Sequence, residues 1–365
     1  MNRYTVLGQL GDGSFGVVSK AQQTNTGEIV AVKKMKQRFN SWEECLQLRE
    51  VQLLRKVQHP NIVKLKEVVR ENNELFLVFE YMEMNLFSIQ RMRAEQMSGV
   101  QSLFNDREIR SIMCQTLLAV QAMHKSGFMH RDLKPENLLI KGDIVKVADF
   151  GLAKEIRSRP PFTEYVSTRW YRAPEIILRS THYNSPVDIW ACGVLFAELY
   201  LNRPLFPGSS DNDQLFKICS VLGAPTPAEW DEGHQLSRRL NMRFPTVAPT
   251  PLRQLLSSAP PTAIDLIEQT TALYAGISTG QPHNPFQFQK KSPSSPQVGA
   301  QDRCQSPGVG VASAGVCENS SSFECSTTKP PCLNANAGKS ASFLDVVRSV
   351  PHGSAKPVDG DEFNF

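Results

Sequence analysis

HRDLKPEN, residues 130–137, gathers charged and amide side chains into one short stretch, and the nearby ADFG contributes Asp149. Carboxylate and amide oxygens are the ligands that a hard cation such as Mg²⁺ prefers, so Asn137 and Asp149 are candidate metal ligands. Asp132 can orient a hydroxyl group and accept its proton, while Lys134 can offset charge on a moving phosphoryl group. These residue types therefore suit phosphoryl transfer, which depends mainly on positioning and charge neutralisation.

A glycine-rich stretch near the start of the chain indicates a nucleotide site. GDGSFGVV supplies Gly11, Gly13 and Gly16 in a G-x-G-x-x-G pattern, which dinucleotide-binding turns share. Here, however, the last glycine runs into VVSKA, which reads as a strand and not a helix, and a second strand, IVAVKKM, follows with Lys33. Ala31 and Lys33 share one face of that strand, so a surface flat enough for a purine lies beside an ammonium for phosphates.

The segment after these strands predicts a helix with a buried acid. Ser41 and Glu44 in SWEE fit a capping box, which predicts a helix that runs to about Val57. Glu50 lies on the apolar face of that helix. A buried carboxylate without a partner is costly, so we expect an ion pair with Lys33. The alternative is a solvated glutamate at the edge of the helix.

All these motifs occur in the order found in eukaryotic protein kinases. The chain resembles the group that holds the cyclin-dependent and mitogen-activated kinases. LREV, YNSPVD and SRPPFTEYVSTRWYRAPE narrow the resemblance to the subfamily of male germ cell-associated and intestinal cell kinases and its plant relatives. The resemblance covers residues 1–268, nearly three quarters of the chain.

The resemblance implies an α+β, bilobal protein-kinase fold. Residues 1–82 would form a small, mostly antiparallel β lobe with one key helix, and residues 83–270 a large, mostly helical lobe that is C-terminally truncated. Residues 271–365 are rich in Ser, Pro, Gly and Gln and lack periodicity. Such a composition cannot bury enough apolar surface to offset chain entropy, so we expect a disordered tail.

The resemblance also implies ATP and Mg²⁺ as cofactors and assigns roles to individual residues. The catalytic set would be Asp132, Lys134, Asn137, Lys33 and Glu50. LFLVFEYMEMN reads as a buried strand that leads into a connector with backbone groups for a purine edge. The nucleotide would lie against Leu10, Gly11, Gly13, Ser14, Gly16, Val18, Ala31, Lys33, Phe79, Glu80, Met82 and Leu139.

TEYVSTRWYR, which begins at Thr163, resembles the dual-phosphorylation switch of the family. A phosphate on Thr163 would give the fixed charge of Arg131 a bidentate partner and would order the loop. Arg169 and Arg172, taken as unpaired cations, would do the same for a phosphate on Tyr165.

The resemblance also suggests how a protein substrate is chosen. Ser167 would line a pocket for a proline after the target residue, with Arg172 shaping the floor and Thr168 beside it. Glu136 would pair with an arginine three residues before the target. RCQSP in the tail fits this pattern at Ser306, so self-phosphorylation there is one hypothesis, and a tail merely rich in Ser and Pro is the other.

The end of the kinase-like region departs from the family. After AIDLIEQ, relatives continue with W-D-P-x-x-R and two helices, where this chain has TTALYAGISTGQPHN. We therefore expect Glu175 to lack its arginine, at a cost of about 3–5 kcal/mol. We also expect exposed apolar surface on the helix that starts at Ser185 and Pro186, whose Asp188 would hold the catalytic loop. The alternative function is therefore a weak or inactive kinase-fold chain that binds and titrates partners, and chaperone binding is plausible.

Composition excludes several other classes of protein. The 365 residues are 41% hydrophobic and 21% charged with a net charge of +4, so neither a nucleic-acid nor a membrane partner is implied. The start MNRYTVLGQL lacks a signal-peptide pattern, and the cysteines read as reduced thiols, with zinc binding left open for the four after position 300. We expect a monomer in the cytoplasm or nucleus that meets protein substrates and an upstream activating kinase. A ciliary role rests on the resemblance alone.

Overall fold

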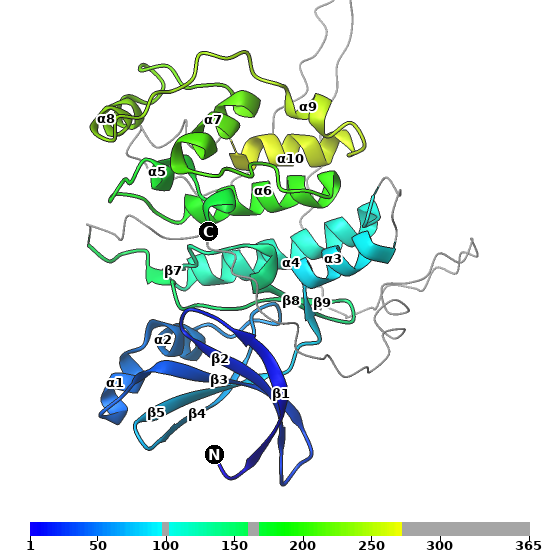
Figure 1. Ribbon diagram of the computed structural model, residues 1–365, viewed down its shortest axis with the longest axis vertical. Coiled ribbons are helices and arrows are strands. Elements are labelled where there is room, and N and C mark those ends of the chain that lie inside the picture. The colour runs from blue at the N-terminus through cyan, green and yellow to red at the C-terminus, as the bar shows by residue number, and fades with distance from the viewer. Residues whose placement is uncertain (97–101, 160–167, 272–365) are drawn as a thin grey trace, which may run out of the picture. The chain divides into compact units, whose positions relative to one another are not determined.

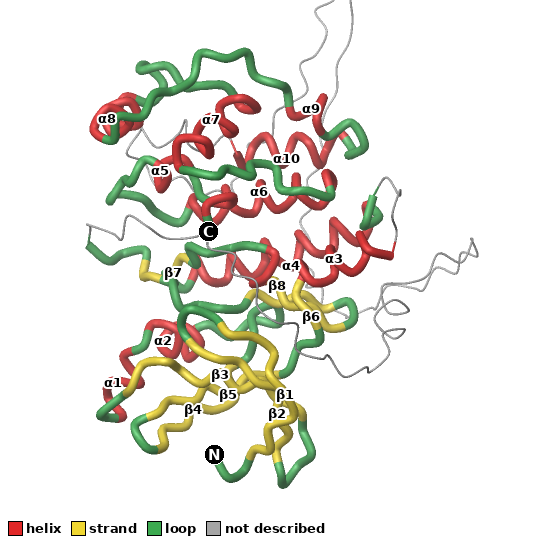
Figure 2. The backbone as a smooth tube through the Cα atoms, viewed as in Figure 1, coloured by secondary structure: helices red, strands yellow, loops and turns green. Residues whose placement is uncertain are grey.

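The computed structural model describes residues 1–96, 102–159 and 168–271, which belong to one compact unit. Figure 2 shows that strands gather in the first part of the chain and helices in the rest. The elements, in chain order, are β1 (Tyr4–Asp12), β2 (Gly16–Gln23), β3 (Ile29–Arg38), α1 (Trp42–Gln47), α2 (Arg49–Lys56), β4 (Leu65–Glu71), β5 (Glu74–Glu80), β6 (Met84–Asn85), α3 (Leu86–Gln96), α4 (Asp106–Lys125), β7 (Phe128–Met129), the 3-10 helix η1 (Pro135–Asn137), β8 (Leu138–Lys141), β9 (Ile144–Val147), β10 (Lys154–Glu155), the 3-10 helix η2 (Arg169–Tyr171), α5 (Pro174–Ile177), α6 (Pro186–Leu201), α7 (Asp211–Leu222), α8 (Asp231–Arg239), α9 (Leu252–Leu255) and α10 (Pro261–Thr271).

The N-terminal lobe is built on one antiparallel sheet with the strand order β1-β2-β3-β5-β4. Alternation along β3 divides its side chains between the two faces of the sheet. Val30 and Val32 pack into a buried cluster with Ala21 and Val78. The residues between and after them, Ala31 and Lys33, therefore share the opposite face, as the sequence predicts.

The single helix expected from Ser41 to Val57 is wrong, because two helices form. Leu48 has extended backbone angles (φ −60°, ψ 129°), so α1 ends before it and α2 begins after it. Cys45 and Glu50 are both buried, at 0% and 4% exposure. On one continuous helix they would point about 140° apart, so the break allows both to face the interior.

The predicted cap of α1 forms in part. Ser41 Oγ accepts the backbone N–H of Glu44 at 3.2 Å, as expected of an N-cap serine. The Glu44 carboxylate accepts the N–H of Asn40 and not that of Ser41, so the reciprocal bond is displaced by one residue.

In the C-terminal lobe, α6 is the central helix. Every residue from Val187 to Tyr200 is buried, and α6 packs against both α4, which precedes it in the chain, and α10, which follows it (cyan and yellow in Figure 1). A Cβ on Gly193 would lie 3.0 Å from Cβ of Thr270, so α10 approaches α6 closely. The expectation that α6 would expose apolar surface is wrong, because α10 covers it. Pro186 is the first helical residue and Ser185 the N-cap residue, although its side chain makes no capping bond.

Cysteines before position 300 are free thiols. Cys45, Cys192 and Cys219 are buried, whereas Cys114 is exposed on α4. The four later cysteines, and with them the hypothesis of a zinc site, lie outside the described residues. So do the rest of the tail and the residues Thr163, Tyr165 and Ser167.

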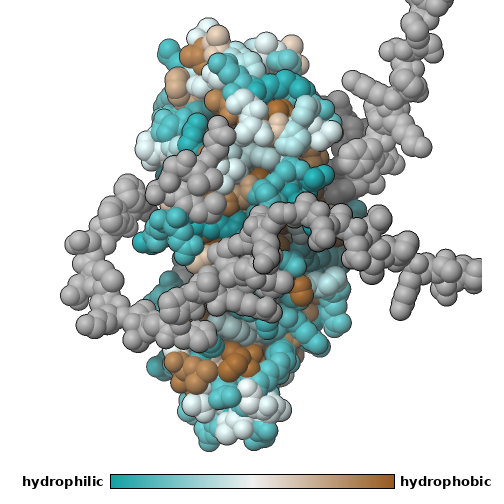
Figure 3. Space-filling view, turned by 90° about the vertical axis from the view of Figure 1, so that its right-hand side faces the viewer, coloured by the Kyte–Doolittle hydropathy of each residue, from teal (hydrophilic) through white to brown (hydrophobic). Residues whose placement is uncertain are grey.

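The surface of the described residues is mixed in polarity. Figure 3 shows hydrophobic residues in limited areas among hydrophilic ones on the face it presents. None of the helices in the described ranges is both long enough and apolar enough to cross a lipid bilayer.

Candidate active site

Lys33 joins three parts of the chain at one point. Its Nζ lies 2.9 and 3.1 Å from the two carboxylate oxygens of Glu50, on α2, and 3.2 Å from Oδ1 of Asp149. Lys33 and Glu50 are only 7% and 4% exposed. The structure thus confirms the predicted ion pair between Lys33 and Glu50. It rules out a solvated glutamate, because Glu50 is buried and its carboxylate contacts the Lys33 ammonium.

These contacts favour the charged forms of Lys33 and Asp149, whereas burial raises the pKa of Glu50 despite the charge of Lys33. Burial alone would lower the pKa of Lys33, but the charges of Glu50 and Asp149 raise it above its ordinary value. Burial alone would raise the pKa of Asp149, but the charge and hydrogen bond of Lys33 lower it. At neutral pH the site therefore presents an ammonium and a carboxylate within contact distance of each other.

The glycine loop approaches this cluster closely. Gly13 and Gly16 exchange backbone hydrogen bonds of 3.0 and 3.3 Å, and β2 begins at Gly16, which confirms that the last glycine leads into a strand. A Cβ on Gly16 would lie 3.1 Å from the carbonyl carbon of Lys34, so the position leaves little room for a side chain. Phe15, at the tip, lies over Gly151, where an added Cβ would come within 2.8 Å of the ring.

Asp132 accepts hydrogen bonds from three directions. Its Oδ1 accepts the backbone N–H of Thr168 at 3.0 Å, and its Oδ2 lies 3.0 Å from Nζ of Lys134 and 3.3 Å from Nδ2 of Asn137. Asn137 Nδ2 also donates to the Asp132 carbonyl oxygen at 2.8 Å. Because the amide nitrogen of Asn137 is used in this way, its oxygen is the end that a cation would meet.

Asp188, on α6, anchors the start of residues 130–137, the stretch predicted to be the catalytic loop. Its carboxylate accepts the backbone N–H groups of His130 and Arg131, both at 2.8 Å, and a bond of 2.7 Å from Nε2 of His124. Burial alone would raise the pKa of Asp188, but the bond and charge of His124, the charge of His130 and the Arg131 N–H lower it. Arg131 adopts a left-handed backbone conformation (φ 68°), which this anchor helps to hold.

Arg131 has two further cations to consider with it, Arg49 and Lys154, which the sequence motifs did not identify. Its Nε donates to the Leu152 carbonyl and its Nη1 to the Tyr183 hydroxyl. Burial, and then the charges of Arg131 and Arg49, lower the pKa of Lys154. Arg131 and Arg49 therefore each lie close enough to Lys154 for their charges to act on it.

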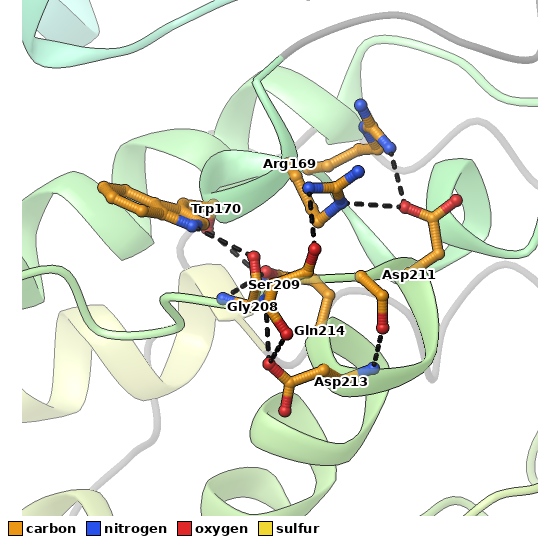
Figure 4. A network of polar contacts seen from close by, with 9 residues as sticks. Arg169, Trp170, Gly208, Ser209, Asp211, Asp213 and Gln214 are labelled. Atoms are coloured by element: carbon orange, nitrogen blue, oxygen red, sulfur yellow. Dashed lines mark hydrogen bonds and ion pairs between the residues drawn. The ribbon is translucent and has the colours of Figure 1, made fainter. Parts of the chain in front are cut away.

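Arg169 and Arg172 are not unpaired, contrary to the sequence prediction. Arg169 Nε and Arg172 Nη1 donate to the same oxygen of Asp211, at 3.1 and 3.2 Å. Figure 4 shows Arg169 and Asp211 pointing toward each other at the start of α7. A shared acidic partner from another element was not visible in the local sequence.

A groove of about 980 Å³ runs beside the catalytic loop. Its lining includes Glu136, Thr168, Arg169 and Arg172. The residues predicted to face a protein substrate, apart from Ser167 outside the described ranges, therefore share one open surface. Lys134 Nζ donates to Thr168 Oγ1 at 3.1 Å and links this surface to the catalytic loop.

Most of the residues predicted around the purine fall on strands, and Gly13, Ser14 and Met82 lie between strands. Val18 lies opposite Lys33 in the register of β2 and β3, and Ala31 lies opposite Phe79 in that of β3 and β5. Past the connector, Leu139 pairs with Asn85 at the start of the second lobe. The remaining members divide by exposure: Leu10, Gly11, Gly13 and Ser14 are exposed, Glu80 is intermediate, and Met82 is buried.

Glu175 forms no ion pair within the described part of the chain. Its side chain lies inside the C-terminal lobe, with the residue 6% exposed. Burial raises the pKa of Glu175 to about 7, and the nearby charge of Glu232 adds to this effect. The predicted lack of a cationic partner is thus confirmed for these residues.

The sheet, the buried Lys33–Glu50 pair and the two motifs around Asp132 and Asp149 define a protein kinase domain. A profile of the protein kinase domain family matches residues 4–273, and the chain belongs to this family. It is similar to serine/threonine-protein kinase ICK of Mus musculus (55% identical over 268 residues) and serine/threonine-protein kinase MAK of Homo sapiens (52% over 270). The likeness extends to cyclin-dependent kinase F-3 of Oryza sativa subsp. japonica (53% over 269).

These matches cover only part of the relatives. They take in 73–74% of this chain, but 42% of each mammalian relative and 60% of the rice relative. The chain thus spans about two fifths of the length of the mammalian proteins it matches.

Proposed function

We propose that this chain is a serine/threonine protein kinase that transfers the γ-phosphoryl group of ATP to protein hydroxyl groups. The observation that carries the proposal is the convergence of Lys33, Glu50 and Asp149 within 3.2 Å, with Asp132 held on the adjoining loop. A lysine kept charged by two acids is suited to phosphate oxygens. The similarity to serine/threonine-protein kinases supports the same activity.

The nucleotide would enter between the glycine loop and the strand face that bears Ala31. Asn137 and Asp149 fit Mg²⁺, since each presents an oxygen and a cation bound with a nucleotide needs only one or two protein ligands. When bound, Mg²⁺ would neutralise charge on the phosphate oxygens. Lys33 would orient the phosphates. Glu50 would hold the Lys33 ammonium in place through a charge interaction that the low-dielectric interior strengthens.

Asp132 would act on the acceptor hydroxyl. Thr168 and Asn137 both donate to it, which fixes its rotamer, and Lys134 lies 3.0 Å from its Oδ2. Asp132 would accept a hydrogen bond from the serine or threonine hydroxyl and take its proton as the oxygen bonds to the γ-phosphorus. The bond from that phosphorus to the β–γ bridging oxygen would break in the same transfer, and ADP would leave. Lys134 would offset the negative charge on the transferred group.

The groove beside Glu136 would hold the protein substrate. A proline after the target is accommodated because it has no N–H to leave unsatisfied, and Ser167 with Arg172 would shape that pocket. Glu136 is exposed in the groove, where an arginine before the target could reach it. Proline-directed phosphorylation is therefore our proposal for substrate choice.

Phosphorylation of Thr163 and Tyr165 would activate the enzyme. The phosphate on Thr163 would meet Arg131, together with Arg49 and Lys154, whose mutual repulsion an anion relieves. Arg169 and Arg172 would receive the phosphate on Tyr165 beside their present partner Asp211. An upstream kinase is the implied partner, and free buried thiols fit a reducing compartment such as cytoplasm or nucleus.

Radiolabelled phosphate transfer tests the proposal. The purified chain, with Mg²⁺ and γ-labelled ATP, is expected to label a basic protein substrate on serine and threonine. Asp149→Asn is the matched control, because it keeps the side-chain shape but removes the carboxylate that would bind Mg²⁺. Labelling on tyrosine alone, or none from a folded chain phosphorylated on Thr163, would contradict it.

A further inference from the structure

The segment that follows Thr168 is held at every residue. Arg169 donates to Asp211 and to the Ser209 carbonyl, and Trp170 Nε1 donates to the Gly208 carbonyl at 3.1 Å. Tyr171 donates its hydroxyl hydrogen to Glu198 at 2.7 Å. Arg172 donates to Asp211, so this carboxylate is bound from both ends of the segment. Such dense contacts leave little freedom in its shape.

Gln214 joins this segment to α7 from inside the lobe. It is completely buried, its Oε1 accepts the Gly208 N–H at 3.0 Å, and its Nε2 donates to the Trp170 carbonyl at 3.4 Å (Figure 4). A Cβ on Gly208 would lie 2.6 Å from Cα of Gln214, so the loop needs a glycine to come this close. An amide is the side chain that can serve both partners, because it carries a donor and an acceptor.

Asp211 gives the two arginines a negative partner within the fold itself. Its carboxylate lies at the N-terminal end of α7, where the helix dipole also favours negative charge. Its side chain is 18% exposed, and that of Arg172 is 3% exposed. The Arg169–Arg172 geometry therefore does not depend on an anion supplied from elsewhere.

We propose that Asp211 and Gln214 are positioning residues for substrate recognition: the first turn of α7 holds Thr168–Arg172 in the shape that receives the residue after the target, without phosphate on Tyr165. This inference rests on the proposed function. The segment lines the groove, and Thr168 contacts Asp132, so a shift in it would move the peptide relative to the catalytic carboxylate. Phosphate on Tyr165 would then adjust the shape of Thr168–Arg172 but would not be required to form it.

Peptide binding tests this inference apart from catalysis. Two fluorescent peptides, one with proline and one with alanine after the serine, are compared by anisotropy on the full chain. Tyr165→Phe is expected to leave the preference for proline unchanged. Asp211→Asn and Gln214→Glu are expected to reduce that preference about tenfold, since a buried partner is lost. Asp265→Asn, an exposed carboxylate on α10 paired with Arg253, is the matched control.

The affinity for a nucleotide analogue separates positioning from general damage. It is expected to stay within twofold in all variants, because these residues do not line the nucleotide site, and a merely structural defect would lower both affinities. A preference unchanged in both Asp211→Asn and Gln214→Glu would overturn the inference, and so would its loss in Tyr165→Phe. Failure of phosphate transfer with intact peptide preference would instead count against the proposed function.

Discussion

Two buried carboxylates of the C-terminal lobe, Asp188 and Glu175, stand in opposite electrostatic states. Asp188 is 1% exposed and accepts bonds from two backbone N–H groups and a histidine, and its pKa is lowered. Glu175 is 6% exposed, its pKa is raised to about 7, and no cation among the described residues pairs with it. Burial is similar in the two, so the partners decide the charge.

The difference separates a region arranged for chemistry from one that limits stability. Two of the three contacts of Asp188 reach the catalytic loop, and the third comes from His124 on α4. The fixed anion helps to keep Arg131 in its left-handed conformation. Around Glu175 the carboxylate either stays protonated or bears the cost of an isolated buried charge. We therefore expect changes at Asp188 to act on rate and changes at Glu175 to act on stability.

Asp188→Asn should have the largest effect. An amide presents N–H groups toward one of the two backbone donors, which leaves that donor without an acceptor. We expect phosphate transfer to fall about 100-fold, as when positioning shifts by 1 Å, and the free energy of unfolding to fall by about 3 kcal/mol. Initial rates and urea denaturation measure the two effects, with Asp265→Asn as control. A rate within threefold of wild type would show that the anchor is dispensable.

Glu175→Gln should stabilise the protein increasingly as pH rises from about 4.5 to about 7, with the full gain above that range. The folded-state pKa lies above the unfolded value, so wild type is most stable below about pH 4.5 and loses stability as pH rises to about 7. The loss is about 3 kcal/mol, from a shift of roughly two and a half pH units. Urea denaturation at pH 8 should show this gain and at pH 5 little difference. An equal gain at both values would mean that charge is not the cause.

His124→Leu should have a smaller effect than either, because Asp188 keeps its two backbone donors. The lost bond goes to a buried charge, so we expect about 2 kcal/mol less stability at pH 7. The pKa of Asp188 should rise toward its ordinary value, so this stability is present above about pH 3.8 in wild type and lost below it. Denaturation across acid pH checks the prediction, with His124→Gln as the variant that retains a donor. Matching curves for wild type and His124→Leu would contradict it.

Glu232→Gln should have the smallest effect. Glu232 is exposed and acts on Glu175 only through its charge, which raises the pKa of Glu175. Removal of the Glu232 charge should raise the stability at pH 8 and low salt by a small fraction of the gain from Glu175→Gln. Added salt should abolish this small gain, because it screens the charge of Glu232. Thermal denaturation of single and double variants measures it. A gain that survives in the Glu175→Gln background would show that the two residues are not coupled.

Local motifs predicted the contacts of the candidate active site well, because a charged side chain in a buried position requires a partner of opposite charge. A glutamate on an apolar helix face needs a cation, and Lys33 was the nearest candidate on the adjoining strand. The break between α1 and α2 at Leu48 was not predictable, because the apolar residues on both sides of it also fit the spacing of one continuous helix. The partners of Arg169 and Arg172 were missed because Asp211 lies about forty residues later, on another element. Local pattern says little about such long-range pairs.

The initial rate of phosphate transfer by wild type and Asp132→Asn tests the central claim most directly. Both chains are phosphorylated beforehand at Thr163 and compared with Mg²⁺, ATP and a serine peptide, with thermal denaturation showing that both are folded. We predict a rate lower by about 10²–10⁴-fold in Asp132→Asn, with unchanged ATP affinity, because the general base is lost while the nucleotide site is kept. Equal rates in the two folded chains would contradict the account.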